Sequence, residues 1–308
     1  MNQTHPDPVK GALFMIAAGI AFALANALTQ IVTFHLGFKP QSDTFWQYAI
    51  ALALALPFVW REGLAGFRTQ HPVLHIARVI VSAFGVQAFV MALAHGVPIW
   101  QVIALVMTSP FFVMLGAFLF LGERVGPNRW GAAALGFSGA MILLRPWEQG
   151  FTAASLLPLA AALLWAAASL LTKRLTRTER PQTVTLWLLA LLTPINAGLS
   201  LQAGFEWPAG TILLALLAGG VLMLAAQHLL TLAYSSADAA FVQPFDDLKL
   251  LSNILVGWLI FGYLPEGTLW LGVAMILAAS SWLLWSEREG GTPAPGTGAL
   301  ARPTPETT

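Results

Sequence analysis

The sequence predicts an all-α integral membrane protein in which ten transmembrane helices form two inverted five-helix repeats. Three features support this prediction: apolar stretches of roughly twenty residues recur along most of the chain, charged residues make up only 9% of it, and short motifs recur about 140 residues apart. A helix of about 20 apolar residues is long enough to cross the ~30 Å hydrocarbon layer of a bilayer. Ten such stretches leave little chain for a soluble domain, so we expect the function to lie inside the membrane.

The apolar stretches are separated by loops that are mostly a few residues long. We place them at Gly11–Phe34, Phe45–Trp60, His75–Ala94, Pro98–Leu121, Trp130–Leu144, Ala153–Thr172, Thr183–Leu201, Ala209–Tyr234, Ala239–Phe261 and Thr268–Trp285. The first stretch lacks an A-x-A cleavage site, so it is expected to be a retained span and not a signal peptide. The tail, residues 288–308, is rich in Pro, Gly and Thr and is expected to be disordered.

Lys and Arg are distributed unevenly over the two sets of loops. With the N-terminus inside, the inner segments hold eleven of these residues and the outer loops hold two. An excess of positive charge marks the cytoplasmic side of a membrane protein. We therefore expect both termini in the cytoplasm and the protein in the inner membrane of a bacterium.

Matches at a constant offset divide the chain into two halves. Gly122 lies 140 residues before Gly262, and Phe22 lies 143 residues before Trp165. The halves are residues 11–144 and 151–287, each a five-helix repeat. Because five is odd, the two repeats have opposite orientations, which is typical of carriers that alternate between two open states.

The composition excludes several classes of protein. The net charge of +1 gives no basis for a nucleic-acid partner, and the absence of cysteine excludes disulfides and Cys-ligated metals. The six histidines have no ligand-like spacing within a span, and no GxxxxGK[ST] loop is present. We therefore expect no metal, no cofactor and no direct use of ATP, and the partners are the lipid bilayer and a small-molecule substrate.

The ninth stretch carries charges well inside a predicted span. Asp246, Lys249 and Asn253 follow the helical spacing i, i+3 and i+7, so they share one helix face, whereas Asp247 points about 100° away. A charged residue at a helix centre costs about 2.5–3.5 kcal/mol on insertion scales. These four residues are therefore predicted to line the substrate cavity. The alternatives are a structural Asp–Lys pair and a lysine that reaches the headgroups.

Polar and aromatic residues on other stretches complete the predicted cavity. Arg78 is a second candidate for a buried cation, and Phe22 and Trp165 occupy equivalent positions in the two repeats, where a large ring could stack on a solute. The predicted cavity residues of these stretches are Phe22, Asn26, Arg78, Ser82, Gln87, Trp165, Ser169 and Gln227. Packing against lipid or the protein core is the alternative for the aromatic rings.

Two prolines and three glycines are candidate hinges. A proline inside a helix removes a backbone hydrogen bond and kinks the helix, and small residues near helix centres permit close helix contact. The candidate hinges are Gly85, Pro110, Gly219, Gly220 and Pro244. Static kinks and close packing are the alternatives.

Two motifs resemble those of the drug/metabolite transporter superfamily, in particular its ten-helix EamA-type members. The fourth stretch ends in Leu121-Gly122-Glu123-Arg124 before a Trp-Gly helix, and the ninth contains Val242-Gln243-Pro244-Phe245. The resemblance covers about residues 11–287 and implies a secondary carrier that works by alternating access. In similar proteins, the cavity is lined mainly by the first, third, fourth, sixth, eighth and ninth helices.

The resemblance implies a transporter and not an enzyme. We expect it to export small metabolites, foremost amino acids with aromatic or neutral side chains, as the amino-acid exporters of this superfamily do. Asp247 and Arg78 would meet the charged groups of the solute, and Trp165 and Phe22 its side chain. The alternatives are an uptake carrier for a vitamin or a nucleotide-like metabolite and an intramembrane lipid-linked transferase. The oligomeric state is open between monomer and homodimer.

Overall fold

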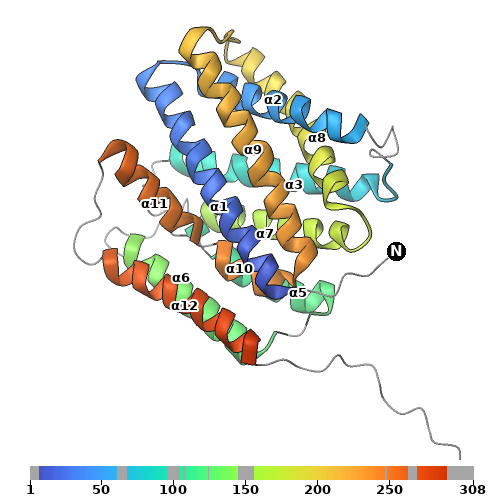
Figure 1. Ribbon diagram of the computed structural model, residues 1–308, viewed down its shortest axis with the longest axis vertical. Coiled ribbons are helices and arrows are strands. Elements are labelled where there is room, and N and C mark those ends of the chain that lie inside the picture. The colour runs from blue at the N-terminus through green and yellow to red at the C-terminus, as the bar shows by residue number, and fades with distance from the viewer. Residues whose placement is uncertain are drawn as a thin grey trace, which may run out of the picture.

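The computed structural model describes residues 7–60, 68–95, 105–106, 108–123, 125–144, 156–246, 248–262 and 269–289. These parts of the chain consist of helices and their connections and contain no strand (Figure 1). The first half holds α1 (Pro8–Gln30), the short π-helix η1 (Ile31–His35), α2 (Pro40–Trp60), α3 (Pro72–Ala94), α5 (Ser109–Leu121) and α6 (Pro127–Leu144). The second half holds α7 (Leu156–Thr176), α8 (Pro181–Gln202), α9 (Gly210–Ser236), α10 (Ala239–Asp246), α11 (Leu248–Phe261) and α12 (Leu269–Glu289).

Local signals in the sequence fix several helix ends. Asp7 caps α1, because its side chain accepts a hydrogen bond of 3.0 Å from the backbone N–H of Lys10. Gly122 ends α5 and Gly262 follows the last residue of α11, with φ angles of 68° and 72°. These left-handed conformations favour glycine. The two glycines, 140 residues apart in the sequence, therefore end their helices in the same way.

The helix contacts are symmetric between the two halves. α1 packs along α9 and α3 packs along α7, while α2 packs on α8 and α6 on α12. α1 also contacts α11, and α5 contacts α7. If α1, α2, α3, α5 and α6 are exchanged with α7, α8, α9, α11 and α12, in that order, every one of these contacts becomes another of them or itself. Figure 1 shows the α1–α9 pair and, at the other side of the bundle, the α6–α12 pair.

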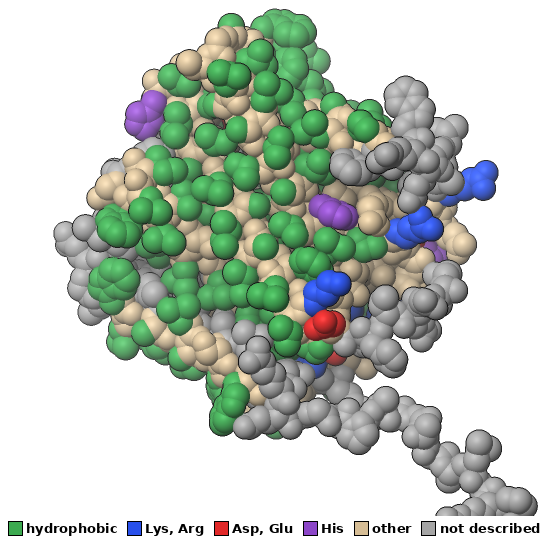
Figure 2. All heavy atoms as spheres, in the orientation of Figure 1, with side chains coloured by type: hydrophobic (Ala, Val, Ile, Leu, Met, Phe, Trp, Pro, Cys, Tyr) green, Lys and Arg blue, Asp and Glu red, His purple; other side chains and the backbone are tan. Residues whose placement is uncertain are grey.

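The outer surface is matched to lipid. Large apolar side chains such as Leu119, Phe120 and Leu259 are more than half exposed, and the face in Figure 2 is mostly hydrophobic, with its charged side chains gathered toward the right. By length and composition, five of the described helices suffice to cross a bilayer: Pro8–Thr33, Pro72–Phe89, Leu156–Thr176, Pro181–Gln202 and Gly210–Ser236. The chain is therefore an all-helical protein with several membrane-compatible helices.

Two expected stretches differ from the helices that the structure describes. The expected span Ala239–Phe261 is divided into α10, which ends at Asp246, and α11, which begins at Leu248. Pro244 lies inside α10 and cannot donate a backbone hydrogen bond there, which weakens the helix near its end. In the expected span Pro98–Leu121, α5 begins only at Ser109, and residues 98–104 lie outside the described part of the chain.

Candidate functional site

A cavity of about 370 Å³ lies between α2, α3, α7, α8 and α9. Small-molecule sites in proteins have volumes of about 300–1,000 Å³. Its lining consists of Thr44, Tyr48, Arg78, Ser82, Ala83, Val86, Trp165, Ala168, Ser169, Thr172, Leu188, Leu192, Asn196, Gln227, Leu230 and Tyr234. Aromatic, hydroxyl, amide and aliphatic groups are mixed in this set, and none of the described residues that line the cavity is acidic.

Helical spacing brings the lining residues of α3 and α7 to the cavity. Arg78, Ser82 and Val86 follow one another at four-residue intervals on α3, so they share one face of that helix. Trp165, Ser169 and Thr172 do the same on α7 at intervals of four and three residues. The two helices pack along each other, and these two polar faces form one side of the cavity.

Trp165 is held against α3 by a glycine. An ideal Cβ atom placed on Gly85 would lie 2.6 Å from Nε1 of Trp165, which is too close for any side chain. The indole also packs on the ring of Phe89, with ring centroids 5.9 Å apart. Gly85 and Phe89 therefore fix a flat aromatic surface in the wall of the cavity.

Arg78 brings a buried positive charge to the cavity. Its residue is 4% exposed, and its one hydrogen bond to the described residues runs from Nη1 to the Val184 carbonyl oxygen at 3.4 Å. A guanidinium group has five N–H donors. Most of its hydrogen-bonding capacity is therefore not used by the described part of the protein.

Two tyrosines and two glutamines line or support the opposite wall. Nε2 of Gln227 donates to the hydroxyl oxygen of Tyr48 at 3.4 Å, and the hydroxyl of Tyr234 donates to Oε1 of Gln243 at 2.9 Å. The chain holds only three tyrosines, and two of them lie in this lining. The cavity can therefore offer both donors and acceptors to a polar solute.

The charged residues of α10 and α11 form a separate cluster beside α1. Lys249 donates to Oδ2 of Asp246 at 2.6 Å, and Asn26 donates to Oδ1 of Asn253 at 3.1 Å. An ideal Cβ on Gly19 of α1 would lie 3.2 Å from Cβ of Lys249, so the two helices approach each other closely here. We call Asn26, Asp246, Lys249 and Asn253 the α1–α11 cluster; none of the four is among the residues that line the cavity.

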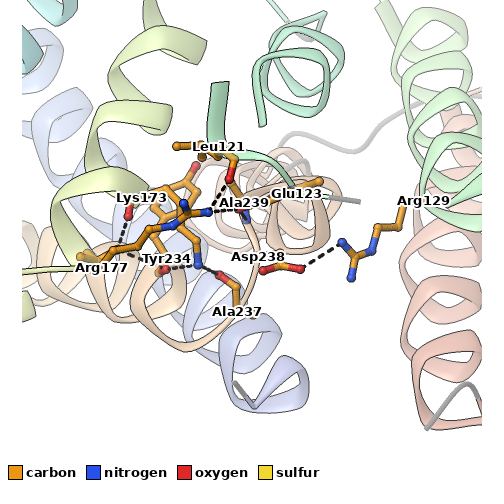
Figure 3. A network of polar contacts seen from close by, with 11 residues as sticks. Leu121, Glu123, Arg129, Lys173, Arg177, Tyr234, Ala237, Asp238 and Ala239 are labelled. Carbon is orange, nitrogen blue, oxygen red and sulfur yellow. Dashed lines mark hydrogen bonds and ion pairs between the residues drawn. The ribbon is translucent and has the colours of Figure 1, made fainter. Parts of the chain in front are cut away.

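A second polar network lies one helical turn beyond the cavity (Figure 3). The carboxylate of Glu123 accepts hydrogen bonds from the backbone N–H groups of Ala239 and Ala240 at 3.2 and 3.1 Å, and it lies 3.7 Å from Arg177. A carboxylate in this position caps the N-terminus of α10.

Lysine and arginine side chains of α7 extend this network. Lys173 donates to the carbonyl oxygens of Tyr234 and Ala237 at 3.0 and 2.5 Å, and Arg177 donates to the Leu121 carbonyl at 3.1 Å. Glu123, Lys173 and Arg177 form what we call the Glu123 network, which joins the end of α5 to α7, α9 and α10. Because Tyr234 also lines the cavity, the network closes the protein beside that end of the cavity.

The structure brings together five of the predicted cavity residues: Arg78, Ser82, Trp165, Ser169 and Gln227. Asn26, Asp246, Lys249 and Asn253 lie in the α1–α11 cluster, Gln87 is exposed, and Phe22 on α1 is half-buried outside the lining. Asp247 lies outside the described residues.

Helices that the sequence did not point to supply much of the lining. Thr44 and Tyr48 come from α2, and Leu188, Leu192 and Asn196 come from α8. The resemblance implied the first, third, fourth, sixth, eighth and ninth helices, whereas the described lining comes from the second, third, sixth, seventh and eighth. The scarcity of tyrosine and the one-turn spacing of Thr44 and Tyr48 were usable signals.

The candidate hinges lie at points of close contact or at helix ends. An ideal Cβ on Gly219 would lie 3.2 Å from Gln47, and one on Gly220 would lie 2.5 Å from Ile50, so both glycines let α9 approach α2. Pro110 lies in the first turn of α5, where its missing N–H breaks no helical bond. Pro244 lies two residues before the end of α10. A hinge role for these residues stays a prediction.

A family model for "EamA-like transporter family" matches the chain twice, over residues 9–145 and 152–285. The chain belongs to the EamA-like transporter family. This family and its named relatives are transporters, so the protein is a transporter and not an enzyme.

Curated relatives align with this EamA protein over nearly its whole length. A riboflavin transporter of Rhizobium johnstonii is 59% identical over 93% of this chain and 96% of its own, and one of Vibrio cholerae is 45% identical over 90% and 93%. An S-adenosylmethionine uptake transporter of Rickettsia felis is 23% identical over 92% and 96%. A solved crystal structure, at 21% identity, has a TM-score of 0.70 and covers 92% of this chain and 98% of that one; this likeness is one of fold.

The relatives correct one expectation about this EamA protein. Export of amino acids is wrong, because the relatives at 45–59% identity are named riboflavin transporters. The cavity offers a physical reason: the ammonium group of an amino acid would need a carboxylate partner in a buried site, and none of the described lining residues supplies one.

Proposed function

We propose that the protein is a riboflavin carrier that takes the vitamin up across the bacterial inner membrane and holds it in the cavity between α2, α3, α7, α8 and α9. Three relatives at 45–59% identity bear this function in their names. The chemistry of the cavity lining is the observation that carries the proposal, because an indole, a guanidinium and several hydroxyl and amide groups surround one space of about 370 Å³.

Riboflavin matches this lining group by group. Its isoalloxazine ring is flat and aromatic and can stack on Trp165. The pyrimidinedione end of the ring carries carbonyl oxygens that can accept hydrogen bonds from Arg78. The ribityl chain carries hydroxyl groups, for which Ser82, Ser169 and Thr172 offer small polar partners.

The same lining disfavours the substrate of the more distant relatives. S-adenosylmethionine carries a positively charged sulfonium, which Arg78 would repel and which no described lining residue would neutralise. A neutral, ring-containing vitamin meets no such penalty. This difference separates the two kinds of uptake substrate found among the relatives.

We propose ten transmembrane helices in two inverted five-helix repeats, residues 11–144 and 151–287, with a disordered tail at 288–308. The two family matches, the symmetric helix contacts and the shared left-handed glycines at 122 and 262 support the repeats. The distribution of Lys and Arg supports cytoplasmic termini. The Glu123 network then lies at the cytoplasmic end of the cavity.

Alternating access follows from this arrangement. In the described conformation the Glu123 network closes one end of the cavity, so substrate release at that end requires its contacts to break. Gly85, Gly219, Gly220, Pro110 and Pro244 are the proposed points of movement. The α1–α11 cluster, with Asp246 and Lys249, lies next to the junction of α10 and α11 and would move with it.

Growth of a riboflavin-auxotrophic bacterium without its own riboflavin uptake tests the proposed function. We expect this protein to lower the external riboflavin concentration needed for growth, and Trp165→Leu to abolish most of the gain. Excess tryptophan or S-adenosylmethionine should not compete. The proposal fails if the protein, although present in the membrane, leaves the riboflavin requirement unchanged.

A further inference from the structure

Arg78 is a buried cation without a carboxylate partner among the described residues. It is 4% exposed, its one hydrogen bond to these residues is long at 3.4 Å, and no acidic residue lines the cavity beside it in the described part of the chain. A buried charge that lacks hydrogen-bond partners is strongly unfavourable. Such a residue is retained where a ligand supplies the missing acceptors, and its place in the cavity wall exposes it to one.

We infer that Arg78 determines the specificity of the cavity by binding the pyrimidinedione edge of the isoalloxazine ring. This inference rests on the proposed riboflavin carriage and names the part of the ligand that is recognised. The edge presents a carbonyl oxygen next to a ring nitrogen, two acceptors side by side. The planar fork of a guanidinium matches such a pair with two parallel hydrogen bonds, which a lysine ammonium cannot make.

The spacing along α3 places the two ends of the ring. Arg78 and Gly85 are seven residues apart, which is an axial rise of about 10 Å in an α-helix. Gly85 is the seat of Trp165. The guanidinium and the indole therefore lie at two ends of the α3 stretch that borders the cavity, and a flat tricyclic ring can lie on the indole while its pyrimidinedione end reaches Arg78.

The ribityl chain is the competing partner for Arg78. Hydroxyl groups are weaker acceptors than the carbonyl oxygens of the pyrimidinedione, and they neutralise a guanidinium less well. Small polar groups suited to hydroxyls are present elsewhere in the lining, at Thr44 and Asn196. The ring is therefore the part of the ligand that a buried guanidinium selects.

Binding of riboflavin and lumiflavin to the purified protein tests this inference. Lumiflavin keeps the ring but has a methyl group in place of the ribityl chain. We expect Arg78→Gln to weaken both ligands equally, by about 10- to 100-fold, the range typical of hydrogen bonds to a charged group. Arg78→Lys should recover only part of the loss, because it restores the charge without the fork.

The outcomes separate this inference from the function on which it rests. If the wild type binds no riboflavin, the proposed function fails and the inference falls with it. If Arg78→Gln weakens riboflavin but not lumiflavin, Arg78 binds the ribityl chain and the inference alone is overturned. A lower thermal stability with unchanged affinity for both ligands would make Arg78 a structural residue and overturn it as well. Should Arg78→Gln not fold, the ratio of the two affinities in Arg78→Lys decides the same question.

Discussion

Trp165 of α7 fills the space that a side chain at position 85 of α3 would need. Nε1 of the indole would lie 2.6 Å from a Cβ atom on Gly85, and Cδ1 would lie at 2.7 Å. Because Gly85 is buried within α3, α3 and the indole can come this close only at a glycine. A packing contact between the two halves of the chain thus sets the position of an aromatic surface in the cavity.

Gly85→Ala is expected to displace the indole and to weaken riboflavin binding. The loss should be about two- to tenfold, the range that corresponds to a lost aromatic stacking contact. Binding can be measured by the quenching of flavin fluorescence. Gly198→Ala is the matched control, since an ideal Cβ there has nothing within 4 Å. Equal affinities of the two variants would show that the position of the indole does not matter for the ligand.

Glu123→Gln is expected to destabilise the folded protein. The carboxylate is buried and holds two backbone N–H groups and Arg177 at once, so its neutralisation should cost about 1–2 kcal/mol of unfolding free energy. The midpoint of thermal unfolding in detergent measures the change. Asp238→Asn is the control in the same region, because its side chain is 44% exposed and contacts Arg129 at 3.3 Å, and exposed ion pairs contribute little. A larger loss from Asp238→Asn would contradict the account of the Glu123 network.

Asp246→Asn is expected to slow transport without changing the KM for riboflavin. Asp246 binds Lys249 at 2.6 Å in the α1–α11 cluster and does not line the cavity. Lys249→Met removes the other partner of the same pair and should have the same profile, since two residues that act as a unit do not add. Initial rates of uptake at several riboflavin concentrations give both constants. A raised KM in either variant would place this pair in contact with the substrate.

The absence of cysteine allows a direct test of the membrane orientation. Thr178→Cys in the α7–α8 connection and Gln202→Cys at the end of α8 each place one exposed thiol in the protein. With a cytoplasmic N-terminus, a membrane-impermeant maleimide should label position 202 in intact cells and position 178 only after permeabilisation. The reverse pattern would invert the proposed orientation.

The sequence predicted the helical membrane class well, because apolar length is a local property that a single sequence reveals. It predicted Arg78, Ser82, Trp165, Ser169 and Gln227 as cavity residues for the same kind of reason: a polar or aromatic side chain within an apolar helix is conspicuous. It did not reveal that Asp246 and Lys249 would satisfy each other away from the cavity, since this depends on how α11 packs against α1.

The substrate was beyond the reach of the sequence pattern. An amino acid and riboflavin both call for polar groups and an aromatic surface, and only the packing of α2, α3, α7, α8 and α9 shows which groups share one space. The lining lacks a carboxylate among its described residues, and this is a property of the assembled bundle. Asp247, to which the sequence pattern assigned the charged end of the solute, lies outside the described residues.

Counterflow of riboflavin in proteoliposomes tests the central claim most directly. Vesicles that contain the purified protein and a high internal concentration of unlabelled riboflavin are diluted into labelled riboflavin. The account predicts a transient, saturable accumulation of label that excess lumiflavin suppresses and excess tryptophan does not. Accumulation no greater than in protein-free vesicles, from protein that remains folded, would contradict it.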